Sequence, residues 1–277
     1  MARHLVEAGH TVVGHDIDQA AMDRAAATGV TPADDPAAVA TAADAVVLSL
    51  PGPAAVTAVV DEAIAGFDGG ETVIDCTTSR PDTTSAVAEH LAGHDVALLG
   101  APVSGGQSGA EAGTLSAIVG GSPAALEATR GVLEAFTDDV FHVSDRPEHG
   151  HACKLLNNYL SFTALVATSE AVALGADLGL DVDTMVSVFS ASTGRNSATE
   201  DKFPNQIVTG AYDAGFAMGL MDKDIKLFAE FAEEREMRLM LGTVLRNLVG
   251  YARSDRGPEA DMTEIYPFLR ELSASPD

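Results

Sequence analysis

The residues best suited to chemistry lie in the stretch Gly150–Tyr159, which reads Gly-His-Ala-Cys-Lys-Leu-Leu-Asn-Asn-Tyr. Lys154 and Asn158 stand four residues apart, so on a helix they share one face, with Asn157 beside them. A lysine and two amides are costly to bury unless polar groups lie opposite them. A small hydroxy acid, with one carboxylate and one alcohol, would satisfy these groups. A solvated helix face would equally explain a lone lysine and asparagine at this spacing.

The first half of the chain must supply a scaffold, and its pattern is that of an α/β domain. Short apolar runs alternate with helical segments of about a dozen residues, which is typical of a parallel sheet built from βαβ units. The predicted strands are Thr11–Gly14, Ala45–Leu50, Thr72–Asp75, Val96–Leu99, Leu115–Val119 and Val140–Val143. The predicted helices among them are Asp18–Thr28, Pro53–Ala65, Pro81–Leu91 and Pro123–Phe136.

The second half has no strand pattern and reads as helices separated by glycine-containing turns. The predicted helices are His151–Leu178, Val182–Ser190, Leu220–Arg235, Leu239–Arg253 and Met262–Leu272. We therefore predict two domains, an α/β domain over residues 1–147 and an all-helical domain over residues 148–277. The helix that carries Lys154 begins at their junction, and clefts between domains are common small-molecule sites.

The amino-acid composition indicates which classes of binding partner are disfavoured on electrostatic grounds. The formal net charge is −25, with 41 acidic and 16 basic side chains, and only four lysines occur in 277 residues. Such a field repels phosphates, so the charge argues against nucleic acid and anionic membranes. No apolar run long enough to span a bilayer and no signal peptide are expected, which predicts a cytoplasmic protein. The acidic surface suggests adaptation to high salt, where self-repulsion is screened.

Metal and disulfide chemistry are not indicated. Cys76 and Cys153 are too few for a disulfide framework and lack metal-ligand spacing, and we expect both in the core. The histidines His142, His149 and His151 are potential metal ligands, but residues two apart do not share a helix face. No carboxylate completes a ligand set, so we predict no metal.

Three motifs together resemble the β-hydroxyacid dehydrogenases, a family that includes 3-hydroxyisobutyrate dehydrogenase and tartronate semialdehyde reductase. The first is the Lys154 motif, Lys-Leu-Leu-Asn-Asn after Gly150. The second is Gly100-Ala-Pro-Val-Ser-Gly-Gly106, followed by the segment Gly109–Leu115. The third is Met221-Asp-Lys-Asp-Ile225. The resemblance covers nearly the whole chain and implies a Rossmann-type sheet, an all-α domain and a homodimer or homotetramer formed through the helices.

The resemblance assigns substrate roles. Lys154 would take the proton from the substrate hydroxyl as hydride leaves for nicotinamide, which requires its pKa to fall toward the working pH. Asn158 would orient the hydroxyl, with Asn157 at the substrate side. The substrate carboxylate would be held by Ser104, Gly105 and Gly106, where a hydroxyl and closely approaching backbone N–H groups suit an anion. Alone, Ser-Gly-Gly would be read as a turn. Arg195, in a family-like loop, is left outside the catalytic set.

Other positions would hold the cofactor. Asp16 ends a strand where an acidic side chain accepts hydrogen bonds from adenosine ribose, which favours NAD over NADP. It could instead help cap the next helix together with Asp18. Leu50-Pro51 resembles a family turn against the adenine ribose. By the match of Asp75–Pro81 to a family segment, Thr78 would hydrogen-bond the other ribose. Lys223 would reach the cofactor and active site, or form a surface ion pair with Asp222 or Asp224.

Three departures from the family pattern qualify the prediction. By this resemblance the chain opens inside the helix that normally follows a Gly-x-Gly-x-x-Gly loop. We therefore expect roughly 12–16 residues of the family pattern to be absent, and no phosphate-loop glycine can be named. The absent strand would lie between the strands at Thr11–Gly14 and Ala45–Leu50. Gly100 replaces the usual aspartate, and Glu148 replaces a usual glycine.

The resulting hypothesis is a 3-hydroxyisobutyrate-like dehydrogenase. The alternatives are a glyoxylate, tartronate or succinic semialdehyde reductase of the same family, and a non-catalytic binding or scaffold homologue. Retention of Lys154, Asn158 and Ser104 argues against the scaffold, whereas the missing glycine loop argues for it. A 6-phosphogluconate dehydrogenase is disfavoured, because few basic residues are available for a sugar phosphate.

Overall fold

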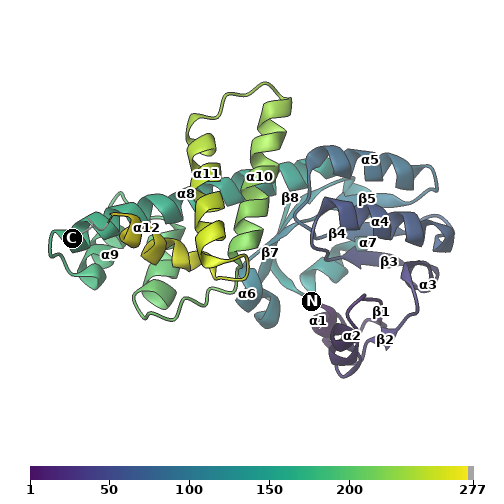
Figure 1. Ribbon diagram of the computed structural model, residues 1–277. Coiled ribbons are helices and arrows are strands. Elements are labelled where there is room, and N and C mark those ends of the chain that lie inside the picture. Colours follow the sequence, from purple (N-terminus) through teal and green to yellow (C-terminus); the bar gives the residue numbers. More distant parts are fainter. Residues whose placement is uncertain (274–277) are drawn as a thin grey trace. The chain divides into compact units, whose positions relative to one another are not determined.

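The computed structural model describes residues 1–273 and divides into two compact units, Met1–Lys154 and Leu155–Asp277. The first unit contains a six-stranded sheet in the order β3-β4-β5-β7-β6, with β8 paired to β7 (Figure 1). Its strands are β3 (Ala45–Leu48), β4 (Thr72–Asp75), β5 (Ala97–Gly100), β6 (Val103–Ser104), β7 (Leu115–Gly120) and β8 (Thr137–Ser144). Strands β3, β4 and β5 run parallel, and β7 runs antiparallel to β5 and parallel to β8.

Alternation along the central strands assigns their side chains to two hydrophobic cores. In β4, Val73 packs in one core and Ile74 in the other, and in β5 Leu98 and Leu99 divide in the same way. The first core includes side chains of α4 (Pro53–Ala63) and α5 (Pro81–Ala92), and the second includes those of α7 (Pro123–Glu134). The sheet is therefore covered by helices on both faces, as expected for a Rossmann-type domain.

Capping residues fix where several of these helices begin. Asp18, Asp35 and Ser122 accept hydrogen bonds from the first turns of α2 (Gln19–Ala26), α3 (Pro36–Ala42) and α7. Proline follows the cap at the start of α3 and α7, where its missing N–H costs nothing. The remaining helices of this unit are α1 (Ala2–Glu7), the short 3-10 helix η1 (Ile64–Gly66) and α6 (Gly106–Ala112).

The first strand of the chain stands apart from the main sheet. Strand β1 (Val13–Gly14) pairs in parallel with β2 (Thr31–Pro32), and these two form a separate sheet. Neither pairs with β3.

Helices make up the regular structure of the described part of the second unit, apart from one isolated antiparallel bridge between Ala217 and Asp261. The unit contains the rest of α8 (Pro147–Asp177), then α9 (Val182–Ala191), the π-helix η2 (Ala198–Ile207), α10 (Met218–Glu234), α11 (Met240–Arg256), η3 (Met262–Glu264) and α12 (Ile265–Ser273). Its core includes fully buried side chains from four of these elements, namely Leu165, Phe203, Met221 and Val249.

Helix α8 corrects one expectation. Its 31 residues have a hydropathy of 1.3 over an 18-residue window, so by length and composition alone it could cross a membrane. The expectation that no apolar run reaches that length was wrong, because no more than two charged side chains fall in that window; 39% of the window is buried within the protein. The same helix carries the buried polar side chains of Lys154 and Asn158.

The fold class predicted from sequence is confirmed, whereas several short elements were missed. The sequence pattern predicts no element at strand β2, helix α3, strand β6, helix α6 or the π-helix η2. All five are ten residues or shorter, and η2 contains Pro204 within the helix, which normally argues against helical structure.

Candidate active site

Helix α8 presents the predicted catalytic face. Lys154 and Asn158 are both buried, each with 6% of its surface exposed, and they lie one turn apart. A charged side chain retained at such burial needs polar partners. Asn157, predicted beside them, is exposed, and its Nδ2 lies 3.4 Å from Asn158 Oδ1.

In the second unit, Asn158 is oriented by a buried carboxylate. Asn158 Nδ2 donates to Asp224 Oδ2 at 2.7 Å, and Asp224 is 2% exposed. Lys223 Nζ lies 3.2 Å from the other oxygen of Asp224. The ion pair considered as the alternative for Lys223 is therefore present. Asp224 is a residue that sequence reasoning missed, although it stands next to Lys223 in the same motif.

In the first unit, the predicted carboxylate loop is a strand-to-helix turn. Ser104 ends β6, and Gly105 and Gly106 begin α6 with φ of +127° and +64°. These values lie in the region that favours glycine. Ser104 is half-buried, and its hydroxyl makes no hydrogen bond to another residue that the structure describes. The loop therefore offers a hydroxyl and helix-start N–H groups, as an anion requires.

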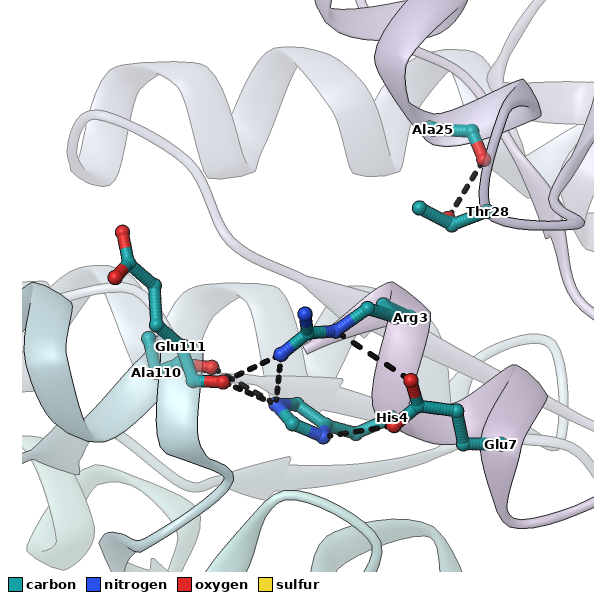
Figure 2. Close-up of polar contacts among 7 residues, drawn as sticks. All are labelled: Arg3, His4, Glu7, Ala25, Thr28, Ala110 and Glu111. Atoms are coloured by element: carbon teal, nitrogen blue, oxygen red, sulfur yellow. Dashed lines mark hydrogen bonds and ion pairs between the residues drawn. The ribbon is translucent and has the colours of Figure 1, made fainter.

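The opposite end of α6 is held by the first helix of the chain (Figure 2). His4 Nε2 lies 3.1 Å from the carbonyl oxygens of Ala110 and Glu111, and Arg3 donates to the same Glu111 carbonyl at 2.5 Å. The last carbonyls of a helix lack intrahelical partners, and basic side chains satisfy them well. Helix α1 therefore caps the short helix whose first residues form the Ser104 loop.

Two of the three departures from the family pattern, Gly100 and Glu148, lie where the end of β5 meets the start of α8. A Cβ on Gly100 would lie 2.2 Å from the Pro147 carbonyl oxygen, and one on Gly150 would lie 2.0 Å from the Gly100 oxygen. The end of β5 and the first turn of α8 therefore pack backbone against backbone. Glu148 is buried and forms an ion pair with Arg146.

The predicted cofactor residues follow the carboxyl ends of strands, where ligands of doubly wound sheets bind. Asp16 follows β1, is exposed, and accepts a hydrogen bond from Asp18 N at 2.8 Å. Leu50 and Pro51 follow β3, and Leu50 N donates to Thr77 Oγ1 at 3.1 Å. Thr78 follows β4 and is half-buried.

These positions fit the two riboses of a dinucleotide in their chemistry, Asp16 on the adenosine side and Thr78 on the nicotinamide side. The exposed Asp16 carboxylate offers hydrogen-bond acceptors for ribose hydroxyls, and Thr78 offers a hydroxyl. The alternative for Asp16 also holds in part, because Asp18, which bonds to it, caps α2. Within residues 1–273, no group of three or more histidine, cysteine or acidic side chains is placed to hold a metal ion. Cys76 is buried as expected, and Cys153 is half-buried.

Each half of the chain matches a model of a known protein family. Residues 1–144 match the family model described as the NAD binding domain of 6-phosphogluconate dehydrogenase. Residues 149–269 match the one described as NAD-binding of NADP-dependent 3-hydroxyisobutyrate dehydrogenase.

Curated relatives and a solved structure agree with these matches. An NAD-dependent L-serine dehydrogenase of Pseudomonas aeruginosa is 34% identical over 92% of this chain and 90% of its own. A 3-hydroxyisobutyrate dehydrogenase of the same organism is 37% identical over 73% and 70%. The structure of a Mycobacterium tuberculosis 3-hydroxyisobutyrate dehydrogenase with L-serine aligns with a TM-score of 0.91 at 27% identity, covering 99% of this chain and 94% of that one.

Proposed function

Because the chain belongs to the β-hydroxyacid dehydrogenase family, we propose that it moves hydride between a nicotinamide cofactor and a small 3-hydroxy acid, 3-hydroxyisobutyrate or a close analogue. The reverse reaction on the semialdehyde is part of the same proposal. The observation that carries it is the buried pair on α8, Lys154 followed one turn later by an Asn158 that Asp224 orients.

Each polar group then has a role in positioning or proton transfer. Lys154 accepts the proton of the substrate hydroxyl during oxidation and returns it during reduction. Asn158 donates or accepts a hydrogen bond at that hydroxyl, while Asp224 keeps its amide in one orientation. Ser104, Gly105 and Gly106 bind the carboxylate, which fixes the carbon that reacts. The nicotinamide, when bound, supplies the hydride chemistry.

The cofactor is NAD(P), and we propose NAD as the preferred form. Asp16 supports this preference because its carboxylate would repel a 2′-phosphate in the position where it accepts hydrogen bonds from a 2′-hydroxyl. Leu50, Pro51 and Thr78 would line the ribose side. Lys223 would reach the cofactor from the second unit.

Two further properties are proposed on the strength of surface composition. Exposed apolar side chains recur along α11, with Met240, Val244 and Tyr251 at 85%, 60% and 71% exposure. Such a stripe supports self-association of helical domains into a homodimer or homotetramer. The acidic surface supports a cytoplasm of high salt, with neither nucleic acid nor membrane as partner. Light scattering and thermal melts in molar KCl test these points, and a melting temperature that KCl leaves unchanged or lowers would refute halophily.

The test of function is turnover of a panel of hydroxy acids. Purified protein in high KCl should reduce NAD with 3-hydroxyisobutyrate or L-serine, and more slowly reduce NADP. Lys154→Ala should lose about 10²–10⁴-fold in kcat and still bind NAD in calorimetry. Lys226→Ala, an equal change at an exposed lysine paired with Asp222, should leave kcat unchanged. Near-normal turnover by Lys154→Ala would refute the proposed role. NAD binding without turnover of any substrate would favour a binding homologue.

A further inference from the structure

A buried histidine with polar neighbours, His151, lies one turn before Lys154. His151, in the first turn of α8, has 0% of its surface exposed, and its Nδ1 lies 2.7 Å from Thr84 Oγ1. The Thr84 hydroxyl donates to the Arg80 carbonyl at 2.9 Å. The direction of the hydrogen bond between His151 Nδ1 and Thr84 Oγ1 depends on which ring nitrogen carries the proton. This bond ties α8 to the first turn of α5.

The other ring nitrogen faces the end of β4. His151 Nε2 lies 3.6 Å from Asp75 Oδ2, which is too long for a hydrogen bond, and Asp75 is 1% exposed. Burial lowers the pKa of His151 and raises the pKa of Asp75, since desolvation disfavours both charges. Within residues 1–273, Nε2 has no hydrogen-bond partner. The pair is therefore a close contact between two buried ionisable groups.

Hydrogen bonds link this buried pair to the predicted cofactor segment. Asp75 Oδ1 accepts from Thr77 N at 3.0 Å, and Thr77 Oγ1 accepts from Leu50 N at 3.1 Å. Thr77 and Leu50 adjoin Thr78 and Pro51, which are proposed to line the ribose. One row of contacts thus runs from the cofactor segment, through Asp75, to the helix that carries the proposed base.

The end of β5 and the start of α8 are closely packed at Gly100, which restricts movement of His151. A Cβ on Gly100 would lie 3.0 Å from His151 Nδ1, in addition to its collision with the Pro147 carbonyl. His151 therefore fills the space beside a position where the family usually has aspartate. Lys154 lies three residues later on the same helix, so the packing that fixes the position of His151 also fixes the position of Lys154.

We propose that His151 is a positioning residue: it locks the first turn of α8 to β4 and α5 and so couples the cofactor segment to Lys154. Its role in turnover rests on the proposed function, whereas its mechanical coupling does not. Close packing of this kind transmits small shifts, and a misplacement of about 1 Å at a catalytic group can cost about 10²-fold in rate.

The first arm of the test is kinetic and uses three variants of the full chain. His151→Ala should lower kcat about tenfold or more while the KM for the hydroxy acid stays within about threefold. His151→Gln should recover most of that loss, because its amide can donate to Thr84. His149→Gln, an exposed histidine in the same turn, is the matched control and should leave both constants unchanged. Wild-type kcat in folded His151→Ala would overturn the proposal.

The second arm does not need turnover. NAD should slow hydrogen exchange of the backbone amides of residues 148–156 in the wild type and in His149→Gln, and this response should be lost in His151→Ala. Urea unfolding then checks that the variant remains folded. A wild-type protein with no such response, or a His151→Ala protein that keeps it, would overturn the coupling. A normal exchange response together with no oxidation of any hydroxy acid would instead refute the proposed function alone.

Discussion

Asn158 Nδ2 donates to Asp224 Oδ2 at 2.7 Å, and both side chains are almost completely buried. A primary amide with a fixed carboxylate acceptor can no longer exchange its oxygen and nitrogen, so its oxygen direction is fixed too. Asp224 therefore fixes the orientation of the Asn158 amide, and with it the direction in which the amide oxygen points.

Replacing that carboxylate should disorder the amide. Asp224→Asn keeps the size of the side chain but allows Asn158 to flip, so we expect kcat to fall about tenfold or more and the free energy of unfolding to drop by about 1–3 kcal/mol. Steady-state kinetics and urea unfolding measure the two effects. Asp201→Asn, at an exposed aspartate on η2, is the control. Unchanged kcat in Asp224→Asn would mean that Asn158 is oriented by other contacts.

Gly100 should tolerate no side chain, because the backbone of Pro147 lies directly against it. Gly100→Ala places a Cβ 2.2 Å from the Pro147 carbonyl, so we expect about 1–3 kcal/mol of destabilisation from forced backbone shifts. Gly131→Ala, in the exposed interior of α7 with no atom within 4 Å of its Cβ, should stabilise by about 0.5–1 kcal/mol. Urea midpoints compare the two. Equal effects at both glycines would show that the junction relaxes freely.

The sequence predicts well those features that depend on neighbouring residues. Lys154 and Asn158 share a helix face because of their spacing, and strands β3 to β5 appear as apolar runs because both faces of the sheet are covered. The pairing of Asn158 with Asp224 spans 66 residues and leaves no local signal. The bond from His4 to Ala110 spans 106 residues, and its partner is a backbone carbonyl, which has no sequence signature.

Short elements could not be predicted for a related reason. The two-residue strands β2 and β6 are too short to show any periodicity, and α6 follows Gly105 and begins with Gly106, residues that favour turns. The tight packing of Gly100 against α8 likewise depends on tertiary structure. From sequence, a glycine at that position could only be reported as a departure from a family pattern.

The clamp that α1 places on α6 should affect substrate binding more than catalysis. His4→Ala removes contacts to two carbonyls at the end of a seven-residue helix that begins beside Ser104. Loss of about 1 kcal/mol at this end should raise the KM for the hydroxy acid about fivefold, with kcat nearly constant. Arg24→Ala, at an exposed arginine of α2, is the control. A fall in kcat without any change in KM would contradict this assignment.

The Arg80–Asp82 pair at the start of α5 should give a defined acid response. Two hydrogen bonds of 2.9 Å from the Arg80 guanidinium, helped by backbone N–H groups, lower the pKa of Asp82 below its ordinary 3.8. A carboxyl whose pKa is lower in the folded state stabilises the protein above the unfolded pKa and loses that contribution as pH falls through the folded value.

Because Asp82 is half exposed, Asp82→Asn should cost only about 0.5 kcal/mol at pH 7. That difference from the wild type should shrink toward zero below pH 3.8, when urea unfolding is followed between pH 7 and pH 3. Asp145→Asn, at an exposed aspartate after β8, should show no such convergence, and a difference for Asp82→Asn that persists at pH 3 would show that charge pairing with Arg80 is not its cause.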